Sequence, residues 1–252
     1  MGAVTPKTIA QLDLAVSHCR ACRRLVNWRE KVASEKRAAF RDETYWGKAV
    51  PGFGPADAAV LIVGLAPAAH GANRTGRMFT GDRSGDVLYA ALHAVGLANQ
   101  PTSTHIDDGL TLHGVRITAP VHCAPPDNKP TVTERDRCQK WLDAELRLLK
   151  PTLKSIVVLG GFGWQALLPV LRKNGWEIPR PNPKFGHGVE VDITAPGHSA
   201  GSTPAPGTVR LFGSYHVSQQ NTFTGRLTPS MIENVLRAAG SHAGLSVSAA
   251  AS

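Results

Sequence analysis

Short runs rich in β-forming residues recur along the chain and predict the strands of a sheet. They occupy residues 59–63, 115–118, 155–159, 189–193 and 209–213. Several of these runs are apolar throughout, which is typical of parallel strands that are buried on both faces. We therefore expect a central, mostly parallel sheet of four to five strands.

Between these runs, apolar residues recur with the helical period. The best helical patterns occupy residues 8–19, 84–95, 133–149, 163–172 and 229–239. Thr133 is predicted to start the third of these helices, and Pro151 to end it. The alternation of strands and helices predicts the α/β class, in a three-layer α/β/α arrangement whose ligands bind at the carboxyl ends of the strands.

Two segments lack a clear pattern. Residues 186–206 are rich in Gly, Pro and Ser around one strand, and residues 241–252 form a tail of small residues that we expect to be disordered. The chain has 252 residues and its composition does not change along its length. We therefore expect a single domain over residues 1–240.

The charge of the chain is strongly positive. Lys and Arg number 28 against 19 Asp and Glu, a formal charge of +9 that favours a polyanionic partner such as DNA, although a merely basic enzyme has the same composition. The apolar runs are too short to span a bilayer, and no basic region followed by an apolar stretch opens the sequence. We expect a cytoplasmic monomer, associated with the nucleoid through DNA.

The four cysteines are candidate metal ligands. Cys19 and Cys22 form a C-x-x-C pair, Cys123 follows the second predicted strand, and Cys138 lies in a predicted helix. Four soft ligands suit a [4Fe-4S] cluster or a structural zinc, and four unrelated buried thiols are the third interpretation. A site closed by thiolates has no open position for substrate, so we expect it to fix the N-terminal segment near the DNA surface.

A long Gly-rich loop, residues 64–82, follows the first predicted strand. Its small residues allow backbone N–H groups to approach a ligand closely. Arg74 and Arg77 are candidate phosphate ligands, Phe79 offers a stacking face, and Asp82 offers a carboxylate. The loop is the main candidate for the active site.

Two further loops follow strands, and together the three loops are expected to surround one cleft. One is residues 123–131, and the other, residues 216–226, begins at His216. The first and third loops read G-L-A-P-A-A-H-G-A-N-R-T-G-R-M-F-T-G-D and H-V-S-Q-Q-N-T-F-T-G-R. The three segments resemble the motifs of the uracil-DNA glycosylase superfamily, and these two runs resemble its family 5, the broad-specificity type B enzymes of bacteria and archaea. The resemblance extends from Cys19 to Arg226.

This resemblance implies an enzyme that flips a nucleotide out of DNA and hydrolytically excises uracil and other deaminated bases, such as hypoxanthine and xanthine. It also implies that the four cysteines bind a [4Fe-4S] cluster. It assigns His216 as the donor to a carbonyl oxygen of the leaving base and Phe79 as the stacking platform, where a buried structural histidine and a core phenylalanine are the alternatives. The expected substrate-binding residues are Gly64, Leu65, Ala66, Pro67, Ala68, Phe79 and Asn128.

The chain departs from the superfamily pattern at two places. Leu65 and Ala66 stand where the best-known branches have a water-activating polar residue. We assign that task to Asp82, for which the N-cap of the following helix is the alternative. Ala119 stands where related iron-sulfur enzymes have an Asn that reads uracil. Asn128 is the expected substitute, with a turn residue as the alternative.

The third loop resembles the segment that enters the minor groove. Gln220, Asn221 and Phe223 are expected to fill the gap left by the flipped base. The expected phosphate contacts are Arg20, Arg23, Arg24, Arg74, Arg77 and Arg226, although each could be a solvated surface charge.

Two other functions agree with part of the sequence. A DNA-binding protein that senses oxidation, without enzymatic activity, explains the charge and the cysteines but not the loops. An enzyme that becomes covalently attached to the abasic sugar needs a nucleophilic histidine, for which His70 is the candidate. The family 5 pattern around His70 disfavours this chemistry.

Overall fold

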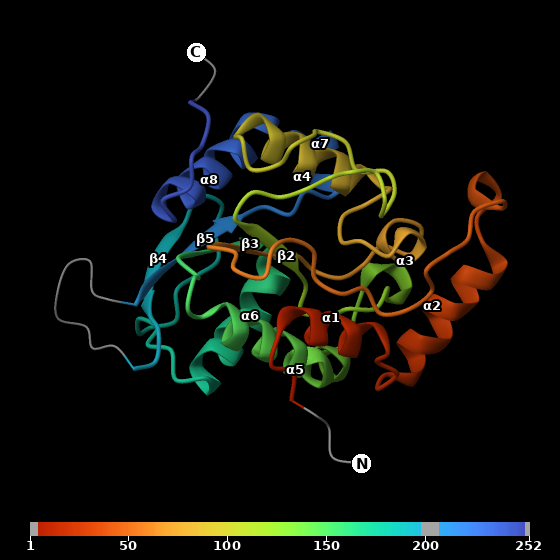
Figure 1. The fold of residues 1–252 in the computed structure, drawn as a ribbon, viewed down its shortest axis with the longest axis horizontal. Helices are drawn as coiled ribbons and strands as arrows, with labels where there is room; N and C mark the ends of the chain where they lie inside the picture. Colours follow the sequence, from red (N-terminus) through yellow and green to blue (C-terminus); the bar gives the residue numbers. More distant parts are fainter. Residues whose placement is uncertain (1–4, 198–206, 250–252) are drawn as a thin grey trace.

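A five-stranded sheet forms the centre of the computed structural model, which describes residues 5–197 and 207–249 (Figure 1). The strands are β1 (Val60–Val63), β2 (Val115–Thr118), β3 (Ser155–Leu159), β4 (Glu190–Thr194) and β5 (Thr208–Ser214). Their order is β2-β1-β3-β5-β4, with β4 antiparallel to β5 and all other pairs parallel. The predicted mostly parallel sheet is confirmed.

The burial of each strand follows its place in the sheet. β1, β2 and β3 are buried at every position. β1 is apolar throughout, whereas the buried Arg116 and Thr118 of β2 donate to Glu145. β4 is an edge strand and is fully buried only at Ile193. Its acidic residues Glu190 and Asp192 pair with Arg210 of the neighbouring β5. Such charges on an edge strand discourage pairing with another chain.

Helices cover both faces of the sheet and complete the three layers (Figure 1). One face carries α4 (Arg83–Ala94) and α8 (Pro229–His242), and the other carries α1 (Ile9–Ser17), α5 (Val132–Leu149) and α6 (Gly161–Lys173). Each face of the sheet has its own apolar cluster, so the core consists of one layer of side chains on each side of the strands. None of the described helices is both long and apolar enough to cross a membrane.

Several helical elements were not predicted from the sequence. They are α2 (Arg23–Glu35), α3 (Ala72–Thr75), α7 (Gln219–Phe223) and 3-10 helices at Ala38–Phe40 and Pro126–Asn128. In α2, Leu25, Val26, Arg29 and Val32 form the buried face. A charged residue within the buried face interrupts the apolar period, which explains why the sequence pattern did not reveal this helix.

The start of α5 differs from the prediction. Its N-cap is Thr131 rather than Thr133, and the Thr131 side chain accepts from the Glu134 backbone N–H while Glu134 accepts from that of Thr131. This reciprocal capping box satisfies two backbone donors that a helix start leaves free.

The C-terminal tail is packed as far as residue 249, so the expectation of disorder is wrong for residues 241–249. Leu245 lies against Gly114, and Val247 lies against Gly240. The Ser248 backbone N–H donates to the Val95 carbonyl at 3.0 Å. The two apolar residues provide the contacts that the small residues around them lack. Residues 250–252, and residues 198–206 of the unassigned segment, lie outside the described part.

Candidate active site and cysteine pocket

A cavity of about 250 Å³ opens at the carboxyl ends of β1, β3 and β5. Because these strands are adjacent and parallel, the residues that follow them meet at one edge of the sheet, where open α/β sheets bind ligands. Leu65 follows β1, Gly160 and Gly161 follow β3, and His216 follows β5. The remaining lining residues are Leu159, Phe162, Phe185, Tyr215, Asn221 and Arg226.

Among the described residues, His216 is the one histidine that lines this cavity. Burial lowers the pKa of its imidazole to about 4, so the ring is neutral near pH 7 and carries one N–H donor. Within the described residues, neither ring nitrogen has a hydrogen-bond partner, whereas the backbone carbonyl of His216 accepts from Asn221 Nδ2 at 2.8 Å. The loop is therefore fixed while the imidazole remains free to bind a ligand.

Phe79 lies beside His216, with ring centroids 6.0 Å apart and an angle of 35° between the planes. Its backbone φ of 53° falls in the left-handed region, which is unfavourable for a bulky residue and is concentrated at functional sites. Gly64 makes room for the ring, since a Cβ at this position would lie 2.9 Å from two of its atoms. A larger residue at position 64 would displace Phe79.

The predicted substrate-binding residues do not all reach the cavity. Leu65 does, and Gly64 supports Phe79 from below. Ala66, Pro67 and Ala68 follow in the same loop but are absent from the cavity lining. Asn128 also lies outside it: this residue is exposed, has a φ of 55° and ends the 3-10 helix at Pro126–Asn128. The structure thus gives Asn128 the turn conformation that was the alternative interpretation.

Asp82 is the N-cap of α4. Its Oδ1 accepts from the backbone N–H groups of Ser84 at 2.9 Å and Gly85 at 3.1 Å. Its other oxygen lies against Gly71, where a Cβ would come within 2.0 Å of it. Burial raises the pKa of the carboxyl. Asp82 therefore caps the helix, and it lies outside the cavity lining.

His70, the candidate nucleophile of the covalent chemistry, is directed to a different partner. Its Nδ1 lies 3.0 Å from the Tyr45 hydroxyl. Burial, together with Arg37 and Arg74, lowers the pKa of the imidazole. His70 does not line the cavity, so the geometry does not support the covalent alternative.

Arg74 and Arg77, expected to contact phosphate, are internal cations in this structure. Arg74 pairs with Glu43 and donates to the carbonyls of His70 and Gly81. Arg77 makes two hydrogen bonds to Asp108, at 2.8 and 2.6 Å. Both arginines are buried. Their guanidinium groups brace the first loop against distant segments instead of facing solvent.

The third loop presents exposed residues beside the cavity. Gln220 is exposed, and the Phe223 side chain is exposed to 69%. The Arg83 guanidinium lies 5.7 Å from the Phe223 ring centroid. Asn221, expected to belong to the same wedge, instead lines the cavity and holds the His216 carbonyl.

Tyr215 and Arg226 form a stacked pair at the cavity that sequence reasoning did not predict. The Arg226 guanidinium lies 4.5 Å from the Tyr215 ring centroid, and the His187 ring stacks on Tyr215 with centroids 5.2 Å apart. Phe162 and Phe185 were also missed as lining residues. The Gly160-Gly161 pair directly after β3 could have revealed Phe162, because it marks a third strand end at the same edge of the sheet. That strand end was not considered.

The N-terminal arginines are exposed to different extents. Arg20 pairs with Glu30 at the surface. Arg24 makes two hydrogen bonds to Glu134, at 2.8 and 2.9 Å. Arg23 is exposed and has no ion pair among the described residues. Of these three, Arg23 offers the freest charge to DNA.

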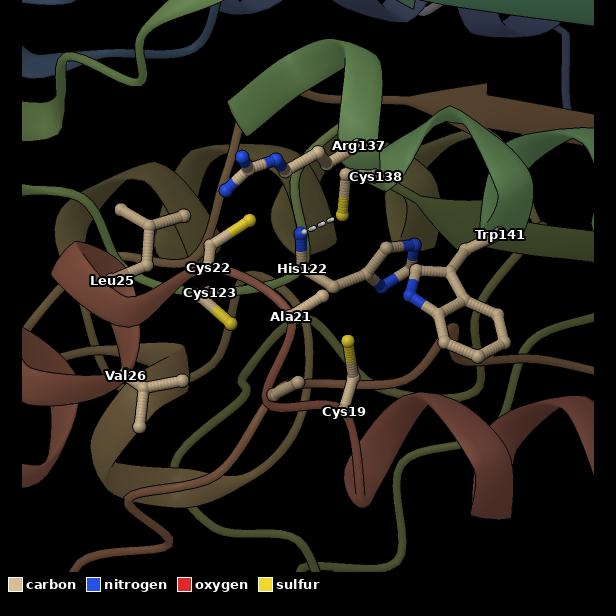
Figure 2. A pocket seen from close by; sticks show the side chains of 11 residues that line it. Cys19, Ala21, Cys22, Leu25, Val26, His122, Cys123, Arg137, Cys138 and Trp141 are labelled. Atoms are coloured by element: carbon tan, nitrogen blue, oxygen red, sulfur yellow. Dashed lines mark hydrogen bonds between the residues drawn. The ribbon is translucent and has the colours of Figure 1, made fainter. Parts of the chain in front are cut away.

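The four cysteines line a second pocket, between α1, α2 and α5 (Figure 2). Cys19 follows α1, Cys22 is the N-cap of α2, Cys123 lies in the loop after β2, and Cys138 lies in α5. Figure 2 shows their sulfur atoms directed toward one space. All four are free of disulfides, and burial raises the pKa of the Cys123 thiol to about 11. The structure therefore brings together the four predicted ligands.

The pocket offers four thiols as its donor set. Within the described ranges, no three His, Cys, Asp or Glu side chains are close enough to hold a single ion, although the four thiols face the same space. Two buried polar atoms of the lining, His122 Nε2 and Trp141 Nε1, have no hydrogen-bond partner in this part of the chain. A thiolate-ligated [4Fe-4S] cluster fits this donor set and spacing.

The fold and site define a class of protein, and comparison with known proteins names it. Residues 51–240 match the family model of the Uracil DNA glycosylase superfamily, to which the chain therefore belongs. Within that superfamily it belongs to the type-5 family, which confirms the resemblance found in the sequence.

Three relatives, each named Type-5 uracil-DNA glycosylase, support this placement. The Mycobacterium leprae protein is 54% identical over 94% of this chain and 97% of its own length. The Thermus thermophilus protein is 49% identical over 90% of this chain and 94% of its own. The relative from Pyrobaculum aerophilum is 42% identical over 90% of both chains.

Proposed function

We propose that the protein is a DNA glycosylase that hydrolyses the N-glycosidic bond of uracil, and of hypoxanthine and xanthine, in DNA. The observation that carries the proposal is His216, a neutral imidazole with unpartnered ring nitrogens within the described residues, placed at the cavity beside Phe79. The superfamily membership and the names of the relatives support the same reaction.

The cavity accepts a base that has left the stack. Chemistry on a base requires that the nucleotide be flipped out of the duplex, and the cost is recovered by contacts in the pocket. Phe79 offers a face for stacking, and Phe162 and Phe185 provide apolar walls. Tyr215, His216, Asn221 and Arg226 are the lining residues with polar side-chain groups. So small a polar set suits a pocket that accepts several deaminated bases.

The reaction develops negative charge on the leaving base and positive charge on the sugar. The C–N bond breaks with its electron pair moving onto the base, and water adds to the sugar carbon. The His216 N–H donates to a carbonyl oxygen of the base as charge accumulates there. The start of α6 lies at the same cavity through Gly160 and Gly161, and the positive end of its dipole favours the anion.

Asp82 serves the sugar side in this proposal, by orienting water or by stabilising the cationic sugar. Its Oδ1 is held by two backbone N–H groups, and this fixes the orientation of the carboxyl. Leu65 occupies the cavity at the first motif and cannot activate water. Asp82 is the remaining carboxylate of the first loop, and its capping bonds are compatible with a second task.

DNA contacts the rim around α7. Gln220 and Phe223 are exposed there and enter the minor groove, where the phenyl ring replaces the flipped base in the stack. Arg226 lies on the rim of the cavity and meets a phosphate beside the flipped nucleotide. The net charge of the chain adds a general attraction to DNA.

The cofactor of this proposal is a [4Fe-4S] cluster held by Cys19, Cys22, Cys123 and Cys138. When bound, the cluster supplies four metal–sulfur bonds that join the N-terminal segment to the core. The ligands leave no position for substrate, so it has a structural role. The reaction at His216 proceeds in a separate cavity.

Incubation with a duplex that carries one uracil, hypoxanthine or xanthine tests the activity. We expect strand cleavage at the damaged position after treatment with alkali, and its loss in the His216→Ala variant. The absence of an abasic product with all three bases overturns the proposal. Measurement of iron and acid-labile sulfide tests the cofactor separately, since a preparation with zinc and without sulfide overturns the cluster but leaves the glycosylase activity in place.

A further inference from the structure

Arg29 is a buried cation at the edge of the cysteine pocket. It lies on α2 and is exposed to only 1%. Its Nη1 donates to Cys123 Sγ at 2.9 Å, and its Nη2 donates to the Cys19 carbonyl at 3.0 Å. Its Nε is buried and has no partner among the described residues. The guanidinium therefore bridges a cysteine of the N-terminal segment and a cysteine of the core.

Arg29 differs from the other buried arginines in its lack of an ion pair within the described residues. Arg74 pairs with Glu43, Arg77 with Asp108, and Arg116 with Asp13 and Glu145. Glu30, the neighbour of Arg29 in the sequence, pairs instead with Arg20 at the surface. A buried charge without a counter-charge is unfavourable, so the position requires an anion that the side chains do not supply.

We propose that Arg29 is the internal counter-cation of the [4Fe-4S] cluster, and that it slows loss of the cluster and raises its reduction potential. The inference rests on the cofactor part of the proposed function. Iron-bound thiolates give the cluster a net negative charge, and reduction by one electron from an external reductant adds another. A fixed cation and an N–H···S bond stabilise the more negative, reduced state more strongly.

The shape of the guanidinium matters as well as its charge. Two parallel donors reach Cys123 and the Cys19 carbonyl at the same time. The single ammonium of a lysine has the charge but lacks the planar fork, so it cannot reproduce both bonds with the same geometry. Two effects of Arg29 are thus separable. Its charge acts on the reduction potential of the cluster, and the shape of its guanidinium acts on how slowly the cluster is lost.

The test uses the full chain and three variants. Arg29→Met removes the charge, Arg29→Lys keeps it without the fork, and Lys31→Met is the matched control because it removes a cation from the exposed face of the same helix. The measurements are iron and sulfide content, the rate at which absorbance near about 400 nm is lost under air with a chelator, and the potential from a reductive titration.

We expect Arg29→Met to lose its cluster at least about tenfold faster than the wild type and to have a more negative potential. Arg29→Lys should lose its cluster faster than the wild type while its potential stays closer to the wild-type value. Lys31→Met should match the wild type in both. If Arg29→Met does not fold, the rate of cluster loss in Arg29→Lys decides the question.

Two outcomes overturn the inference and are distinguishable. Equal rates and potentials in a cluster-bearing wild type and Arg29→Met show that Arg29 has no role toward the cluster, and so does a wild-type rate in Arg29→Lys when Arg29→Met does not fold. A wild-type protein without sulfide overturns the cofactor proposal and this inference together. Neither result affects the glycosylase assay, which reports on His216.

Discussion

His216 combines two properties: its residue lines a cavity, and burial keeps its imidazole neutral near pH 7. A neutral donor suits a leaving base that becomes anionic. The hydrogen bond from the imidazole N–H to the base strengthens as negative charge grows on the base, and the proton does not have to be transferred. The low pKa is therefore part of the proposed chemistry, because it keeps the imidazole neutral in the pH range where a histidine usually titrates.

The first prediction concerns this residue. His216→Ala should lower the single-turnover rate on uracil by about 10² to 10³ while binding to abasic DNA persists, since one donor to a developing oxyanion is lost. In the wild type, the contribution of His216 should be independent of pH from about 8 to about 5, because its pKa is about 4.

His113→Ala is the control, since His113 is exposed and lies outside the cavity. A His216-dependent rate that falls as pH rises through about 6.5 would indicate a protonated imidazole and contradict the prediction.

The residues that sequence reasoning misplaced share one property: each has an ion-pair partner far away in the sequence. Arg74 and Arg77 lie in a Gly-rich loop and have the appearance of phosphate ligands. Their partners, Glu43 and Asp108, come from segments that the loop pattern does not contain. His216 and Phe79 were predicted because their neighbours lie in continuous motifs, whereas Tyr215 came together with Arg226 and His187 only through folding.

At the scale of elements, the start of α4 links the first loop to the helix layer. Asp82 caps the helix, and its carboxyl lies against Gly71 near the middle of the same loop. One side chain thus fixes both the helix and the path of the loop that carries Phe79. Capping and catalysis are separable because Asn also caps helices well.

The second prediction uses this difference. Asp82→Ala should destabilise the protein by about 1 kcal/mol through loss of the cap, while Asp82→Asn should cost less. If Asp82 acts on the sugar side, both variants should lose about 10² or more in turnover. Urea unfolding and single-turnover rates measure the two effects. Wild-type turnover in Asp82→Asn would leave Asp82 with the capping role alone.

The elements themselves were predictable to different degrees. The five strands were predictable from runs rich in β-forming residues. The apolar β1 is typical of a parallel strand buried on both faces, whereas β4 carries acidic residues and lies at the edge of the sheet. The helix α2 was missed because Arg29 stands on its buried face. Thr133 was chosen as the start of α5 because an acidic residue follows it, but the capping box pairs Thr131 with Glu134.

At the scale of the whole molecule, the formal charge of +9 does not say which cations DNA encounters. Arg74, Arg77 and Arg116 are buried in ion pairs. Arg226 is exposed beside the cavity and stacks on Tyr215. Whether a cation contributes to DNA binding depends on its exposure in the fold and not on the sequence motif in which it occurs.

The third prediction contrasts a surface arginine with a buried one. Arg226→Gln should weaken binding to an abasic duplex and reduce the slope of log Kd against log salt by about 1, because one phosphate contact is lost. Arg77→Met should leave the slope unchanged and should destabilise the fold by about 3 to 5 kcal/mol, since Asp108 would remain without its partner.

Binding titrations at several salt concentrations, with urea unfolding of both variants, measure these effects. An unchanged slope in Arg226→Gln would remove this residue from the DNA interface, and a reduced slope in folded Arg77→Met would restore the phosphate role that its burial contradicts.

The distribution of the cysteines along the chain has a consequence for biosynthesis. Translation proceeds toward the C-terminus, so the fourth thiol, Cys138, is made before β3, β5 and His216. The four thiols proposed as cluster ligands therefore all precede the histidine proposed for catalysis and two of the strands that position it. Synthesis of the complete proposed ligand set does not have to wait for synthesis of the proposed catalytic residue.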